Sequence, residues 1–183
     1  MIQIRRARPE DASAIGAIHV AAWRDTYAGI LPDPYLAGLS VARVAASYRR
    51  TLLLRVRGEA AFVAVLPGTG DVVGFATASR ARRAGIADGE VETLYLHPDW
   101  HDNGIGRRLM RAAAAHLGAV GCRSVMLWVL SANNAGWFYR RLGGRPAARE
   151  AIRVAGRTVE QTAVRWDPLA LLLEATAERR AEG

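Results

Sequence analysis

The sequence contains no lysine. All 25 of its basic residues are arginine, against 17 acidic residues, and the formal net charge is +8. It has a single cysteine, Cys122, which excludes an intramolecular disulfide and any metal site built from several cysteines. Its four histidines, His19, His97, His101 and His116, follow no metal-ligand spacing. We therefore expect no bound metal ion.

Long apolar stretches are also missing. Hydrophobic residues make up 51% of the 183 residues, but no apolar run approaches the ~18 residues that a membrane-spanning helix needs. The first nine residues lack the apolar segment of a secretory signal. We expect a cytoplasmic protein with no membrane partner.

The strong positive charge has two explanations. It favours binding to nucleic acid or to another phosphorylated ligand. The arginines, however, are scattered in ones and twos and alanine is very abundant, which equally indicates a bias of composition. Nucleic acid therefore stays an alternative partner that the charge alone does not select.

The pattern of apolar residues and turn residues predicts one α/β (α+β) domain over residues 1–183, with a core over about 2–167. We expect a central twisted mixed sheet of about six or seven strands flanked by helices. Period-two patterns place the strands at about 2–6, 60–66, 72–79, 90–97, 124–130, 148–154 and 157–166. Helical patterns lie at about 9–24, 33–50 with a break at Gly38, 104–120, 133–142 and 168–181.

The clearest chemical signal lies in residues 90–109. A strand and a proline turn lead into a loop with Gly104 and Gly106, and a helix follows. Glycine lets the backbone approach a ligand closely, and the N–H groups of a first helical turn bind anions. This arrangement suits a pyrophosphate. The alternative is an ordinary strand-to-helix turn capped by Asp102 or Asn103.

A second segment covers residues 127–144. Here a strand ends near Asn133, and a short helix carries Phe138 and Tyr139 just before the glycine pair at 143 and 144. Together the two segments resemble the GNAT acetyltransferase superfamily, whose members use acetyl-CoA. The resemblance extends over nearly the whole chain and implies acetyl-CoA as co-substrate, held in a cleft between the fourth and fifth strands.

The resemblance implies three groups of cofactor-binding residues. The first offers backbone groups to the pantetheine arm and the acetyl carbonyl, because an extra residue in the strand frees them from sheet pairing: Leu94, Tyr95 and Leu96. The second forms the pyrophosphate loop: His101, Asp102, Asn103, Gly104, Ile105, Gly106 and Arg107. In the third, Asn133 is directed at the pantetheine portion and Tyr139 protonates or stabilises the departing thiolate.

The pyrophosphate loop departs from the family pattern. Family members usually carry Gln or Arg at the position of His101, and often Gly and a basic residue at those of Asp102 and Asn103. A carboxylate beside a pyrophosphate repels it, so Asp102 is expected to lower the affinity for the cofactor. Backbone donors do not depend on side-chain identity, and we still expect binding.

Acetyl transfer to an amine also needs a general base. An amine with a pKa of about 10.4 is protonated at neutral pH and must lose a proton before it attacks. Glu90 and Glu92 share one face of their strand if period two holds, and Glu90 lies where several family members place a catalytic glutamate. The sequence does not decide between them, or between catalysis and an exposed strand carboxylate. A backbone N–H near Leu96 is expected to stabilise the oxyanion.

The acceptor is predicted from residues 23–32, which look similar to a bacterial subgroup that includes polyamine acetyltransferases. Trp23 and Tyr27 are four residues apart on a helix, so they share a face and can wall a cationic site. Equally, the two aromatic side chains can pack in the core and anchor the loop that follows the helix. We expect an N-acetyltransferase that acts on a small amine or polyamine by direct attack in a ternary complex. An amine borne by nucleic acid or protein, a non-catalytic acyl-CoA sensor and a homodimer remain open alternatives.

Overall fold

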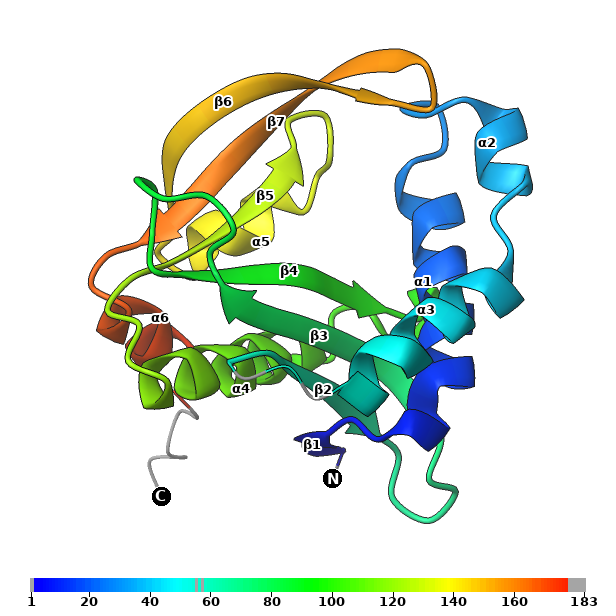
Figure 1. The fold of residues 1–183 in the computed structure, drawn as a ribbon, viewed down its shortest axis with the longest axis horizontal. Coiled ribbons are helices and arrows are strands. Elements are labelled where there is room, and N and C mark those ends of the chain that lie inside the picture. Colours follow the sequence, from blue (N-terminus) through cyan, green and yellow to red (C-terminus); the bar gives the residue numbers. More distant parts are fainter. Residues whose placement is uncertain (1, 55, 57, 178–183) are drawn as a thin grey trace.

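A seven-stranded mixed sheet organises the chain (Figure 1). The computed structural model describes residues 2–54, 56 and 58–177. In chain order the strands are β1 (Gln3–Arg6), β2 (Ala60–Val65), β3 (Val72–Arg80), β4 (Gly89–Leu96), β5 (Val125–Leu130), β6 (Arg145–Val154) and β7 (Arg157–Trp166). Their order in the sheet is β1-β2-β3-β4-β5-β7-β6, and only the β4–β5 pair within this described chain is parallel. All seven predicted strands are confirmed.

The helices also lie close to their predicted positions. They are α1 (Ala12–Thr26), α2 (Asp33–Ala37), α3 (Val41–Leu54), α4 (Ile105–Ala119), α5 (Gly136–Arg141) and α6 (Ala170–Ala175), with 3-10 turns at Pro9–Asp11 and Pro98–Trp100. The break predicted at Gly38 separates α2 from α3. The helix expected over about 168–181 is shorter at its start, which is Ala170, and its last residue is Ala175, with Thr176 as the C-cap residue. Residues 178–181 of that prediction lie outside the described chain.

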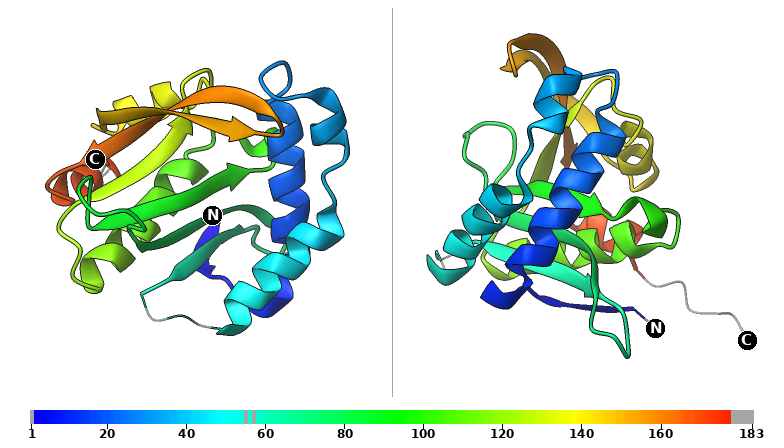
Figure 2. Two further views of the ribbon diagram at one scale, coloured as in Figure 1. Left: turned by 45° about the horizontal axis from the view of Figure 1, so that its top comes forward. Right: turned by 90° about the vertical axis from the view of Figure 1, so that its right-hand side faces the viewer.

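The helices cover the two faces of the sheet separately (Figures 1 and 2). On one face α1 and α3 pack on β2 and β3, through a core that includes Ile15, Val63 and Phe75. The two helices approach closely at Gly16, where an added Cβ would lie 2.8 Å from the Cβ of Ala45. On the other face α4 packs on β2–β4, and α6 lies beside α4.

β4 carries the feature that positions the candidate site. Ala78 of β3 pairs with Val91, but the next residue, Thr77, pairs with Thr93, which leaves Glu92 as an extra residue in a bulge. On the other side of β4, pairing with β5 within the described chain is confined to Gly89–Val125 and Glu90–Met126. Beyond those pairs the two strands diverge, and β4 presents an unpaired edge from Val91 to Leu96 (Figure 1). The predicted opening between the fourth and fifth strands is present.

Candidate active site

The opening between β4 and β5 is a cleft of about 730 Å³. Its walls come from both strands, the start of α4, the region of α5 and the end of α1. Eleven of the twelve predicted cofactor-binding residues line it: Leu94, Tyr95, Leu96, His101, Asp102, Gly104, Ile105, Gly106, Arg107, Asn133 and Tyr139. The twelfth, Asn103, instead donates from its side-chain amide to the His101 carbonyl, at 2.9 Å.

The start of α4 has the geometry of an anion site. Gly104 is the N-cap residue and adopts a left-handed conformation, with φ +70°. No side chain of the described residues caps the helix, so the predicted alternative of a cap by Asp102 or Asn103 is wrong. The N–H groups of Gly106 and Arg107 belong to the first turn, which has no intrahelical acceptor for them. Asp102 also has a positive φ, +60°, which is uncommon for a residue with a side chain.

The two candidate glutamates have different environments. Glu90 has a side chain that is only 5% exposed, and Arg82 Nη2 lies 2.7 Å from its Oε1. Glu92 has a side chain 31% exposed, accepts a hydrogen bond from Ser79 Oγ at 3.0 Å and lies 3.9 Å from Arg82 Nε. Because both carboxylates contact Arg82, they lie on one face, as predicted. Of the two, Glu92 lines the cleft and Glu90 is not among its lining residues.

Tyr139 lies on α5 and is buried against Phe138 and Trp166. Burial, with a contribution from the nearby Tyr27, raises the pKa of its phenol above the ordinary value. The phenol therefore keeps its proton at neutral pH and is available as a hydrogen-bond donor. Asn133 accepts a hydrogen bond from Ala135 N at 2.8 Å, which fixes the turn that leads into α5.

Comparison with known proteins identifies the family. Residues 20–143 match the model of the acetyltransferase (GNAT) family. The chain belongs to this family. It is 30% identical over 174 residues to YuaI of Bacillus subtilis, an uncharacterized N-acetyltransferase, and the match covers 94% of this chain and 96% of YuaI.

Solved structures share the fold of this GNAT acetyltransferase. PaiA N-acetyltransferase from Thermoplasma acidophilum, in complex with coenzyme A, has a TM-score of 0.64 and 21% identity over 88% of this chain and 98% of its own. YncA from Salmonella typhimurium, with its cofactor acetyl-CoA, has a TM-score of 0.68 and 23% identity over 100% of this chain and 98% of its own. The predicted family and fold are confirmed.

The predicted acceptor residues of the GNAT acetyltransferase form part of an aromatic cluster. The rings of Trp23 and Tyr27 meet edge to face, with centroids 4.9 Å apart, and Tyr27 lines the cleft. Trp23 is not among the cleft residues and stacks on His19, at 5.3 Å. Burial raises the pKa of Tyr27, and the neighbouring Asn133 and Tyr95 side chains oppose this shift. Both predicted roles, a wall of the site and a pin for the loop, are therefore compatible with Tyr27, whereas the position of Trp23 favours the second.

Sequence reasoning missed the surroundings of His19. Its Nδ1 lies 3.0 Å from the Tyr48 hydroxyl, and its ring centroid lies 5.1 Å from that of Tyr95. Burial lowers the pKa of His19 to about 4, so the ring is neutral at physiological pH. A histidine at a helical position gives no sign of such partners, since Tyr48 and Tyr95 are far from it in sequence.

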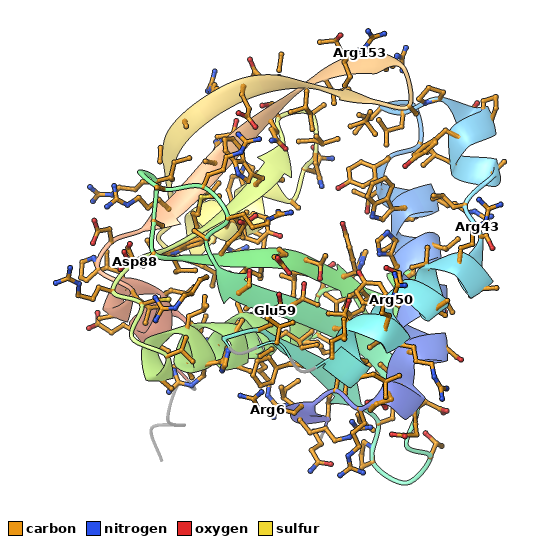
Figure 3. The ribbon with its side chains drawn as sticks, in the orientation of Figure 1. Arg6, Arg43, Arg50, Glu59, Asp88 and Arg153 are labelled. Atoms are coloured by element: carbon orange, nitrogen blue, oxygen red, sulfur yellow. The ribbon has the colours of Figure 1, made fainter. Side chains whose placement is uncertain are left out.

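Among the described residues, the arginines do not gather around the cleft of the GNAT acetyltransferase. Figure 3 shows Arg6, Arg50 and Arg153 on β1, α3 and the β6–β7 hairpin. Arg107 lines the cleft, whereas Arg108 donates to the Ile2 carbonyl at 2.6 Å and ties β1 to α4. Much of the positive charge is thus spread over the surface or used in structural contacts.

The described part of the chain shows neither a metal-binding cluster nor a membrane-spanning helix. Within residues 2–54, 56 and 58–177, no group of three or more His, Cys, Asp or Glu side chains is arranged to hold a metal ion. Over the same ranges, none of the helices has the length and apolar character needed to cross a membrane.

Proposed function

We propose that this GNAT acetyltransferase moves the acetyl group of acetyl-CoA to a primary amine, by direct attack in a ternary complex. The observation that carries the proposal is the β4–β5 cleft, in which an unpaired strand edge, a helix N-terminus and a carboxylate meet. The coenzyme A and acetyl-CoA of the PaiA and YncA structures support the cofactor.

The cleft fits the chemistry of acetyl-CoA. The first turn of α4 offers backbone N–H groups and the positive end of a helix dipole to the pyrophosphate. The free edge of β4, from Val91 to Leu96, offers backbone groups to the amides of the pantetheine arm, as an additional strand would use them. Asn133 and the loop 101–107 complete the proposed cofactor site, and the Asp102 carboxylate opposes it.

Glu92 is the proposed general base. It lines the cleft, whereas the Glu90 carboxylate is buried and held by Arg82. The acceptor ammonium gives its proton to the Glu92 carboxylate, directly or through water, and the free amine attacks the thioester carbonyl. A C–N bond forms, and the backbone N–H near Leu96 stabilises the oxyanion of the tetrahedral intermediate.

Collapse of that intermediate breaks the C–S bond and releases the thiolate of coenzyme A, and the nitrogen gives its second proton to solvent to leave the neutral amide. Tyr139 is proposed to donate a hydrogen bond to this sulfur. Because its pKa is raised well above the thiol value of about 8.5, the phenol stabilises the thiolate as a donor more readily than it transfers its proton.

A small amine or polyamine is the proposed acceptor. Besides Asp102 of the proposed pyrophosphate loop, the cleft is lined by the carboxylates of Asp25 and Glu92, and Tyr27 adds an aromatic ring. Carboxylates and aromatic faces both favour a bound cation. An amine borne by protein or nucleic acid is the second candidate.

Thiol release from acetyl-CoA, measured across a panel of amines, tests the proposal. We expect turnover with at least one primary amine, together with acetyl-CoA binding in calorimetry. A pure acyl-CoA sensor would bind without turnover. A nucleic-acid acceptor would instead show RNA binding that weakens steeply between about 50 and 200 mM salt. Absence of both turnover and acetyl-CoA binding would contradict the proposed function.

A further inference from the structure

Ser79 has a buried hydroxyl to which no role has been given above. It lies near the end of β3, is 7% exposed and is not among the residues that line the β4–β5 cleft. Its Oγ lies 3.0 Å from Glu92 Oε1 and 3.0 Å from the Arg80 carbonyl oxygen. A hydroxyl has one hydrogen to donate, and a carboxylate is a stronger acceptor than a neutral carbonyl. We therefore expect Ser79 to donate to Glu92.

The bulge in β4 explains why Ser79 meets Glu92. Ser79 pairs with Glu90 across the two strands, and the extra residue Glu92 has no partner on β3. A bulge residue is left out of the ladder, and its side chain is aimed differently from those of a regular strand. Diagonal neighbours on adjacent strands are about 7–8 Å apart, which a long side chain can span. The glutamate therefore reaches back to the serine that faces Glu90.

The two carboxylate oxygens of Glu92 have different surroundings. Oε1 accepts the hydrogen bond from Ser79, and Arg82 Nε lies 3.9 Å from the same oxygen. That distance is too long for a hydrogen bond, and Arg82 Nη2 is bonded to Glu90 at 2.7 Å. Oε2 of Glu92 accepts no hydrogen bond from the residues that the structure describes. Ser79 thus fixes one oxygen and leaves the other available for the reaction.

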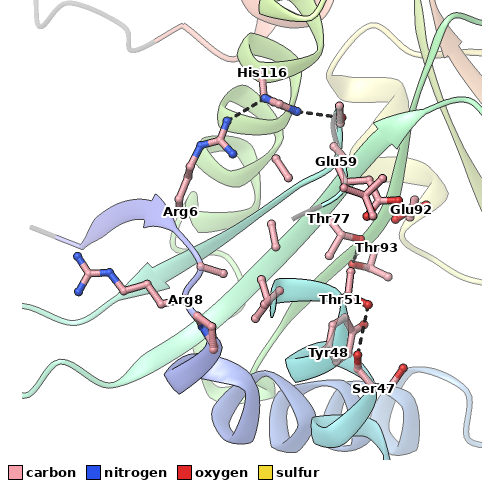
Figure 4. Close-up of a pocket in the computed structure, with 18 of the residues that line it drawn as sticks. Arg6, Arg8, Ser47, Tyr48, Thr51, Glu59, Thr77, Glu92, Thr93 and His116 are labelled. Atoms are coloured by element: carbon pink, nitrogen blue, oxygen red, sulfur yellow. Dashed lines mark hydrogen bonds between the residues drawn. The ribbon is translucent and has the colours of Figure 1, made fainter. Parts of the chain in front are cut away.

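Glu92 lies between two cavities. Its side chain lines the β4–β5 cleft, and it also lines a larger cavity of about 1050 Å³ beneath α3, next to Thr93 (Figure 4). A glutamate side chain has several rotamers, and 31% of this one is exposed. Without an anchor, the carboxylate can turn into the cavity beneath α3. A general base must instead stay within hydrogen-bond reach of the proton that it removes.

We propose that Ser79 is a positioning residue for the general base. Its hydroxyl holds Oε1 of Glu92, so that Oε2 faces the cleft and takes the proton of the acceptor ammonium. Ser79 is not a residue of the cleft and acts through Glu92. This inference rests on the proposed function, because it requires Glu92 to be the base.

The Ser79→Ala variant tests the proposal in steady-state kinetics, with acetyl-CoA and either spermidine or a primary amine that is turned over faster. We expect kcat to fall about tenfold, because the base loses a hydrogen bond to its charged group and leaves its reactive position. The affinity for acetyl-CoA, measured by calorimetry, should stay unchanged. Full kcat in this variant would overturn the inference.

Two further variants separate positioning from packing. Ser79→Thr keeps the hydroxyl and suits a strand, and its kcat should lie within about threefold of the wild type. Ser124→Ala is the matched control, since Ser124 is 6% exposed and its hydroxyl accepts a hydrogen bond from Asp88 N outside the cleft, at 3.0 Å. It should leave kcat unchanged. Equal losses in Ser79→Ala and Ser124→Ala would show a general effect of a lost buried hydroxyl and contradict the proposal.

The Glu92→Gln background gives a comparison that does not depend on the threonine variant. There, Ser79→Ala should lower kcat by less than about twofold, because no base remains to be positioned. A purely structural role of Ser79 would lower kcat by the same factor in both backgrounds. That result would show that the serine does not act through Glu92.

The outcomes separate this inference from the proposed function. If amines are acetylated equally well by the wild type and by Ser79→Ala, the proposed function stands and the role of Ser79 is wrong. If no amine is acetylated, the proposed function fails, and crystal structures of the wild type and of Ser79→Ala with coenzyme A decide whether Ser79 fixes Glu92. A carboxylate displaced towards the cavity beneath α3 in the variant would support the positioning, and the same carboxylate position in both would overturn it.

Discussion

Arg82 and Glu90 form an ion pair between an exposed guanidinium and a buried carboxylate. The side chain of Arg82 is 68% exposed and that of Glu90 is 5% exposed, with Nη2 and Oε1 2.7 Å apart. This hydrogen bond raises the pKa of Arg82. A buried carboxylate is costly without a partner, so the contact with Arg82 offsets the cost of burying Glu90, and Glu92 is the glutamate that lines the cleft.

Removal of the Arg82 charge should therefore destabilise the fold. We expect Arg82→Gln to lower the free energy of unfolding by about 1–2 kcal/mol, less than for a fully buried pair because the arginine is solvated. Urea denaturation measures the change. Arg83→Gln is the control, since Arg83 is 63% exposed and pairs with Glu150 on β6. Adding Glu90→Gln to Arg82→Gln should recover most of the loss; no recovery would show that the arginine stabilises through other contacts.

The two glutamates should differ in catalysis. Glu92→Gln is expected to reduce kcat by about 10²–10⁴-fold, the usual contribution of a general base, with acetyl-CoA affinity unchanged. The loss should shrink as the pH rises, because the acceptor amine then deprotonates unaided. Glu90→Gln should retain most of kcat. Rate measurements over pH 6–10 compare the two, and a larger loss in Glu90→Gln would assign the base to Glu90.

The Asp102 side chain should weaken cofactor binding. Asp102→Asn removes its charge and keeps a residue that tolerates the left-handed conformation. We expect acetyl-CoA to bind about threefold more tightly, from the roughly 0.3–1 kcal/mol that a charge contributes near a helix terminus. Calorimetry at low and high salt measures it, and the gain should fade at high salt. Asp99→Asn, on an 81%-exposed side chain outside the cleft, should change little.

Tyr139→Phe should slow the release of the thiolate. We expect kcat to fall by about 10- to 100-fold, because one hydrogen bond to a charged group contributes about 1.5–3 kcal/mol, and acetyl-CoA affinity to stay the same. Since burial raises the pKa of Tyr139, its ionisation should produce no fall in rate below about pH 10. A variant with full kcat would leave Tyr139 with a packing role.

His19 should make stability depend on pH. Its pKa is lowered to about 4 by burial, below its value in the unfolded chain, so the fold resists its protonation. The contribution is fully present above about pH 6.5 and is lost as the pH falls towards 4, by about 2 kcal/mol after solvent screening is allowed for. Urea denaturation at pH 7 and pH 4.5 should show a smaller difference for His19→Gln than for the wild type. His97→Gln, on a 44%-exposed side chain, is the control.

The order of strands and helices was predictable from the sequence, because apolar periodicity and turn residues act locally. A bulge in this strand was predictable only through the family resemblance, which placed it near Leu94–Leu96 with Glu92 before it. The structure has the extra residue at Glu92 itself, which shows in the pairing with β3 and not in β4 alone. The residues that line the cleft were predictable from the same resemblance, which is carried by the loop with Gly104 and Gly106 and by the helix after Asn133.

The rest depends on contacts between distant parts of the chain. Neither the Arg82–Glu90 pair nor the stacking of His19 on Trp23 leaves a trace in spacing or periodicity. The cavity of about 1050 Å³ beneath α3 is likewise lined by residues of that helix and of strands β2, β3 and β4. Sequence patterns describe single elements, and these features exist only where several elements meet.

The bulge also reverses the alternation of side chains along β4: residues before and after Glu92 follow opposite in–out patterns. Val91 packs in the core on the α4 side, and Thr93, two residues later, lines the cavity on the α3 side, although in a regular strand both would share a face. Loss or gain of one residue at the bulge would move every later side chain of β4 to the opposite face of the sheet. Leu94 and Leu96 would then turn towards α3, and Thr93 and Tyr95 towards α4. The number of residues in β4, as much as their identity, therefore determines whether a general base and a cofactor edge can belong to one strand.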